Sequence, residues 1–137
     1  MISNRLNKAD IIIVDDNLKF RQVLKEIISI EGIATVKGEA SNGLEFLDLL
    51  SNIKPDLVLM DIEMPEMNGM EATQKALELM PDLKIIVLTQ YENEEYLEKM
   101  VALGVRGFIL KSNGIMEIEK AIKSVMKGKI YLYDIII

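Results

Sequence analysis

The chain has 137 residues, a formal net charge of −6, and neither cysteine nor histidine. This length fits one domain with a hydrophobic core. The negative net charge of the chain argues against nucleic-acid binding by this segment. Without cysteine or histidine, thiol catalysis, thiolate zinc sites and imidazole bases are excluded. Catalysis, if any, must use carboxylates, lysine, hydroxyl groups and a hard metal ion.

The first ten residues contain no apolar core of the kind that a signal peptide requires. No apolar run in the chain approaches the length of a membrane span. We therefore expect a cytoplasmic protein without membrane contact.

Short apolar, β-branched runs alternate along the chain with segments of helical periodicity. The predicted strands are 11–14, a weaker one at 34–37 near a sheet edge, 57–60, 85–88 and 107–110. Strong apolar runs of this kind are typical of parallel strands buried on both faces. Helices are expected after Asp16, from Ser41, from Asn68, from Asn93 and before Gly128.

The expected inward faces of the first two helices include Val23 and Leu24, and Leu44 and Phe46, respectively. Five strand–helix units predict an α/β domain, a doubly wound parallel sheet of five strands with five helices on its two faces. Residues 129–137 depart from this pattern because they are strongly apolar. They are either a C-terminal tail or truncated linker, or a strand that pairs with a second copy.

Polar residues stand at the carboxyl ends of four predicted strands. They are Asp15 and Asp16, Asp61, Thr89 and Lys111. In open parallel sheets, functional groups gather outside the carboxyl ends of the strands. Each residue alone has an ordinary explanation, as a helix cap, turn residue or surface charge, but their joint placement predicts one site.

Three carboxylates in one crevice repel each other and require a cation. Hard oxygen ligands favour Mg²⁺, with Mn²⁺ as the other candidate, over zinc or copper. Lys111 adds a positive charge that suits a phosphoryl group. Asp61, beside the metal ion and this lysine, is a candidate nucleophile that would form an aspartyl phosphate.

The residues Asp61-Ile62-Glu63-Met64-Pro65-Glu66-Met67-Asn68-Gly69, with the acid pair, Leu88-Thr89 and Phe108-Ile109-Leu110-Lys111, resemble the receiver domain of two-component response regulators. The resemblance extends from about Asp10 to Gly128, so we assign residues 1–128 to a receiver domain. It implies a flavodoxin-like fold with strand order 2-1-3-4-5.

The resemblance also implies roles. Asp61 would accept phosphate from a sensor histidine kinase or a small phosphodonor. Asp16 and Asp61 would bind Mg²⁺ directly, Asp15 through water, and Glu63 through its backbone carbonyl. Lys111 would contact the phosphoryl group. Thr89 would move toward that group, and Phe108 would turn inward into the space that Thr89 leaves.

Some positions differ from many receivers. Ser112 replaces the proline that often follows the site lysine, Gln90 is larger than the usual residue after the switch threonine, and Phe108 lacks a tyrosine hydroxyl. We expect Glu63, Gln90 and Tyr91 to tune access to the phosphoryl group and its lifetime.

The segments 88–91, 102–108 and 121–129 look like those of LuxR-type transcription regulators, in which a helix-turn-helix domain follows the receiver. DNA would then be contacted only through an output domain outside this chain, and a homodimer through end helices of the sheet is plausible. Two other functions stay open: a Mg²⁺-dependent phosphohydrolase with Glu63 as acid or base, and a receiver-like interaction module that takes no phosphate.

Overall fold

The computed structural model describes residues 8–64, 67–133 and 135–136. In this part of the chain one sheet has the strand order β2-β1-β3-β4-β5-β6-β7, so the predicted order 2-1-3-4-5 is confirmed and two short strands extend it. The strand bounds are β1 Ala9–Val14, β2 Ala34–Ala40, β3 Leu57–Asp61, β4 Lys84–Thr89, β5 Gly107–Leu110, β6 Tyr131–Leu132 and β7 Ile135–Ile136. Strands β1 to β6 are parallel, and β7 is antiparallel to β6.

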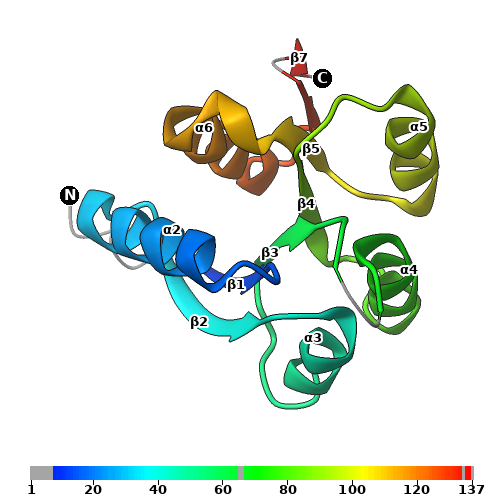
Figure 1. The fold of residues 1–137 in the computed structure, drawn as a ribbon, viewed down its shortest axis with the longest axis horizontal. Helices are drawn as coiled ribbons and strands as arrows, with labels where there is room; N and C mark the ends of the chain where they lie inside the picture. Colours follow the sequence, from blue (N-terminus) through cyan, green and yellow to red (C-terminus); the bar gives the residue numbers. More distant parts are fainter. Residues whose placement is uncertain (1–7, 65–66, 134, 137) are drawn as a thin grey trace.

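The helices lie on both faces of the sheet, with α2 and α6 on one side and α3, α4 and α5 on the other (Figure 1). Their bounds are α2 Leu18–Glu31, α3 Gly43–Leu49, α4 Gly69–Leu79, α5 Glu94–Leu103, α6 Ile115–Met126 and a 3₁₀ turn η1 Lys111–Asn113. The five predicted helices are therefore present. Among the described residues, none of these helices is long and apolar enough to cross a bilayer.

Alternation along the strands builds two hydrophobic layers from one sheet. In β1, Ile11 and Ile13 face α2 and α6, whereas Ile12 and Val14 face the opposite layer. All four side chains are fully buried. This two-sided burial explains why the sequence shows continuous apolar runs. Polar residues begin where each strand leaves the buried layers.

Asparagine side chains cap four of the helices. The Oδ1 atoms of Asn17, Asn42, Asn68 and Asn93 each accept a hydrogen bond from the backbone N–H three residues later, at 2.8–3.1 Å. These caps satisfy backbone donors that the helix leaves free, and they set the direction in which each chain segment leaves its strand.

Three local predictions were wrong. The cap of α3 is Asn42, and the preceding Ser41 instead donates its hydroxyl and backbone N–H to Glu45. Strand β2 continues to Ala40. Val23 and Leu44 are exposed, because each lies at the edge of its helix's apolar face.

The C-terminal segment is part of the sheet. Strand β6 pairs with β5 of the same chain, and Tyr131 is fully buried. The segment that the sequence offered as a strand for a second copy therefore pairs within its own chain. Asp134 and Ile137 lie outside the described residues.

Gly69 brings the start of α4 against the end of β3. Its N–H donates to the carbonyl of Ile62 at 2.8 Å. A Cβ atom at this position would overlap the carbonyl oxygen of Asp61 and lie 2.7 Å from the Cα of Ile62. Only glycine allows this approach, so the backbone of Asp61 depends on it.

We predict that Gly69→Ala destabilises the protein, although Gly→Ala within a helix normally stabilises it by about 0.5–1 kcal/mol. The overlap with backbone atoms should reverse that sign and cost roughly 1–3 kcal/mol in urea unfolding. Gln74→Ala, at an exposed position further along the same helix, is the control and should change stability by less than about 0.5 kcal/mol. Equal stability of Gly69→Ala and wild type would contradict the close approach.

Candidate functional site

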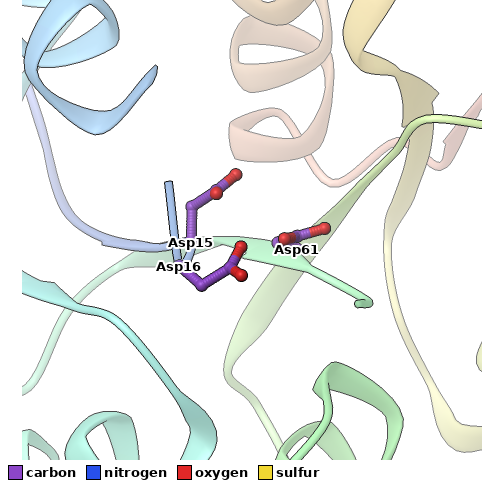
Figure 2. A group of neighbouring side chains, drawn as sticks. All are labelled: Asp15, Asp16 and Asp61. Carbon is purple, nitrogen blue, oxygen red and sulfur yellow. The ribbon is translucent and has the colours of Figure 1, made fainter. Parts of the chain in front are cut away.

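The structure brings the predicted site residues to one edge of the sheet. Asp15 and Asp16 follow β1, Asp61 and Thr89 are the last residues of β3 and β4, and Lys111 follows β5 directly. Because β1 pairs with β3, the three carboxylates lie close to one another (Figure 2). Carboxylate oxygens of the three lie within 4.8 Å of one another.

The three carboxylates differ in exposure. Asp15 is fully buried and Asp61 is 4% exposed, whereas Asp16 is open to solvent. Asp16 also lines a pocket of about 500 Å³ with Glu63, Asn68 and Tyr96. The site therefore has a buried wall and an open side through which a small ligand can enter.

Lys111 neutralises part of this charge. Its Nζ lies 2.5 Å from Oδ2 of Asp15 and 3.6 Å from Oδ2 of Asp61. The Asp15 oxygen makes no hydrogen bond with any described residue and has this ion pair instead. Among the described residues, Lys111 is the one cation that pairs with side chains of the three carboxylates, so the site retains negative charge that suits a divalent cation with oxygen ligands.

Burial and crowding strongly perturb Asp61. Desolvation and the neighbouring Asp15 raise the pKa of its carboxyl to about 7, against the opposing effects of Lys111 and the N–H of Glu63. The Glu63 N–H donates to Oδ1 of Asp61 at 3.3 Å. A perturbed carboxyl in a crevice is a functional-site signal.

Two residues on the first turns of α2 support the site, and the sequence did not identify their roles. Lys111 Nζ lies 4.6 Å from the centroid of the Phe20 ring, within cation–π range. Arg21 donates from its guanidinium to the backbone carbonyl of Asp15 and pairs with Glu39 at 3.3 Å. For Phe20, the one sequence signal of a role at the site is its position about one helical turn after the acid pair.

Arg21 belongs to a larger charged group behind the site. Lys25 also pairs with Glu39, at 2.7 Å, and the two cations hold the pKa of Glu39 below its ordinary value, Lys25 making the larger contribution. The N–H of Asn17 donates to Oδ1 of Asp15 at 2.9 Å. Asp15 is thus held at its carbonyl and at both carboxylate oxygens.

The hydroxyl of Thr89 is bonded to the loop that follows it. It donates to the carbonyl of Tyr91 at 3.1 Å and accepts from the Tyr91 N–H at 3.3 Å. Phe108 is fully buried while Thr89 holds these bonds. The side chains of Gln90 and Tyr91 are exposed, and Gln90 borders a second pocket beside Lys111. Pro65, part of the sequence motif, lies outside the described residues.

Comparison with known proteins decides the family. The model of the response regulator receiver domain matches residues 11–123. This chain belongs to the response regulator receiver family. Members of this family are signalling domains that respond to phosphorylation, which agrees with the resemblance seen in the sequence.

Curated relatives and solved structures agree. The transcriptional regulatory protein DegU of Brevibacillus brevis is 34% identical over 93% of this chain and 54% of its own length. The chemotaxis protein CheY of Thermotoga maritima is 37% identical over 85% of this chain and 97% of its own. A LuxR-family DNA-binding response regulator from Staphylococcus aureus has a TM-score of 0.81 at 30% identity, covering 86% of this chain and 98% of that one.

The raised pKa of Asp61 predicts that the metal-free receiver loses stability as pH rises from about 4 to about 7. The native state keeps this proton up to about pH 7, while the unfolded chain releases it near pH 4. The folded state thus binds more protons across the interval. Asp61→Asn lacks the group and should exceed the wild type in stability above pH 7 by up to about 4 kcal/mol.

The measurement is urea unfolding in a chelating buffer at several pH values. Asp48→Asn, which changes an exposed carboxyl on α3, is the matched control and should follow the wild-type curve. Parallel curves for Asp61→Asn and wild type would show that Asp61 titrates normally.

Proposed function

We propose that this receiver is a switch that takes a phosphoryl group on Asp61 and passes the change to an output domain or partner. The observation that carries the proposal is the position of Asp61, buried at a strand end between two carboxylates and 3.6 Å from Lys111. A carboxylate placed there is desolvated, oriented by the Glu63 N–H and faces a cation.

The acidic cluster supports Mg²⁺ as the cofactor, with Mn²⁺ as a substitute. Asp16 and Asp61 would bind the ion through their side chains, Asp15 mainly through a water molecule and Glu63 through its backbone carbonyl. This assignment agrees with the chemistry of the donors and with the hydrogen-bond-free Asp15 oxygen. When bound, the ion would offset the carboxylate repulsion and the negative charge of a phosphoryl group.

In the proposed reaction, a carboxylate oxygen of Asp61 attacks phosphorus of a phosphohistidine or an acyl phosphate. A new O–P bond forms while the bond from phosphorus to the donor breaks, and the leaving group keeps that electron pair. Lys111 would shift from Asp15 toward the transferred group and neutralise its oxygens. The ring of Phe20 offers the ammonium a surface along which it stays positioned during this shift.

Thr89 is the proposed link to output. Its hydroxyl would give up both bonds to Tyr91 and donate to a phosphoryl oxygen, which frees the loop before α5. Phe108 would respond to this movement as the second switch residue. Gln90, Tyr91 and Glu63 are proposed to tune the lifetime of the phosphoryl group, since they border the open side of the site.

Transcription regulation is the proposed output. The chain spans about half the length of the curated relatives such as DegU and the response regulator GacA of Pseudomonas aeruginosa. We infer that a sensor histidine kinase is the phosphodonor and that DNA is contacted only by an output domain outside this chain. We also propose that the protein is cytoplasmic, where such donors act, and that it forms a homodimer.

The proposal treats the domain as a phosphoacceptor and not as a phosphohydrolase. The side chain of Glu63, the acid or base of the enzyme alternative, is exposed, while its backbone N–H bonds Asp61. Sustained hydrolysis of a small phosphate ester such as p-nitrophenyl phosphate would favour that alternative. Partner binding whose affinity does not change on phosphorylation would favour the interaction module.

We predict that incubation with Mg²⁺ and acetyl phosphate adds one phosphoryl group, detected by intact mass. The adduct should be absent in Asp61→Asn and in a chelating buffer, and present in Asp82→Asn, which changes an exposed carboxyl just before the amino end of β4, away from the carboxyl ends of the strands. An adduct that persists in Asp61→Asn would remove Asp61 from its proposed role.

A second prediction concerns Thr89. Thr89→Ala should still accept the phosphoryl group but show at most half of the near-ultraviolet circular dichroism change of the wild type, because the hydroxyl that connects site and loop is missing. Thr89→Ser keeps that hydroxyl and should restore the change. Identical spectral changes in all three proteins would separate Thr89 from the response.

A further inference from the structure

The C-terminal segment lies against the strand that carries the switch residue Phe108. The N–H of Tyr131 donates to the carbonyl of Arg106, and the N–H of Tyr133 donates to the carbonyl of Phe108, both at 2.9 Å. The ring of Tyr131 is fully buried. The segment 131–133 is therefore a clasp that is bonded along β5 and ends at Phe108.

Tyr133 makes the contacts that matter for the switch. Its ring meets the Phe108 ring edge to face, with centroids 5.3 Å apart and an interplanar angle of 78°. Its backbone has a φ of 44°, a left-handed conformation that a bulky residue adopts only when its contacts hold it there. Phe108 is thus buried beneath a residue of the clasp.

The hydroxyl of Tyr133 reaches the other switch element. It accepts a hydrogen bond from the backbone N–H of Asn93 at 3.4 Å. Asn93 is the N-cap of α5 and ends the exposed loop 90–93, whose first part is bonded to the Thr89 hydroxyl. Phe108 has no hydroxyl, unlike the tyrosine found at this position in many receivers. Tyr133 of the clasp places a hydroxyl beside it instead.

We propose that Tyr133 is a positioning residue that ties the Thr89 loop and Phe108 to the C-terminal clasp, so that phosphorylation loosens the clasp. This rests on the proposed function of Asp61. When Thr89 turns from Tyr91 to a phosphoryl oxygen, the loop 90–93 loses its anchor at one end. At 3.4 Å, the bond from Asn93 to Tyr133 is longer than the bonds that Asn93 accepts from Tyr96 and Leu97, so it breaks first, and its loss frees the ring that covers Phe108.

The coupling is reciprocal because a ligand that favours the loosened clasp is itself favoured by loosening. Tyr133→Phe removes the hydroxyl and keeps the ring, so it should loosen the clasp without phosphate. It should also bind the phosphoryl mimic beryllofluoride, with Mg²⁺, severalfold more tightly than the wild type. A purely structural role for Tyr133 would leave this affinity unchanged.

Hydrogen exchange of the Tyr131 and Tyr133 amides, read by mass spectrometry, tests the proposal on the whole chain. Both amides should exchange slowly without phosphodonor and at least threefold faster with Mg²⁺ and acetyl phosphate. Tyr133→Phe should exchange faster from the start and respond less. Glu98→Gln, which changes an exposed polar side chain on α5 away from the site, is the control and should behave as wild type.

Intact mass of the same samples separates the two proposals. A complete phosphoryl adduct with unchanged exchange would overturn the clasp and leave the function of Asp61 standing. Absence of any adduct would overturn the Asp61 proposal and the coupling together. Unchanged exchange in Tyr133→Phe without phosphodonor would show that the hydroxyl anchors nothing.

Discussion

Electrostatic repulsion among Asp15, Asp16 and Asp61 is the constraint on which the site depends. Strands β1 and β3 of the parallel sheet end side by side, and burial removes the water that would otherwise screen the carboxylates of Asp15 and Asp61. The protein offsets this cost in part with Lys111, and the raised pKa of Asp61 is the remainder. A site that is unfavourable when empty is ready for a cation and for a change of charge at Asp61.

Contacts from Arg21, Phe20 and the loop after Thr89 position the groups of the site without neutralising the carboxylates. Arg21 binds the backbone carbonyl of Asp15, which leaves the carboxylate to the Asn17 N–H and to Lys111. The ring of Phe20 lies 4.6 Å from the ammonium of Lys111, within cation–π range. Thr89 keeps its hydroxyl on the loop beside Tyr91. In the proposed switch, Thr89 and Lys111 would exchange these partners for phosphoryl oxygens.

Much of this was readable from the sequence because it rests on local pattern. The β-branched runs fixed β1, β3 and β4, and polar residues at their ends predicted the site. Long-range contacts were not readable. Tyr131 and Tyr133 appear in the sequence as a tail, and only pairing with β5 reveals their place. Ser41 and Asn42 are both good caps, so local propensity could not choose between them.

Binding of Mg²⁺ tests the central claim most directly, because the acidic cluster should be stabilised by the ion before any phosphate is present. We would measure the free energy of unfolding in urea at pH 7.5 over increasing MgCl₂, with Asp16→Asn as comparison and matched ionic strength throughout. The account predicts a rise with the logarithm of Mg²⁺ concentration that is lost or strongly weakened in the variant. A wild-type stability that does not change with Mg²⁺ would contradict it.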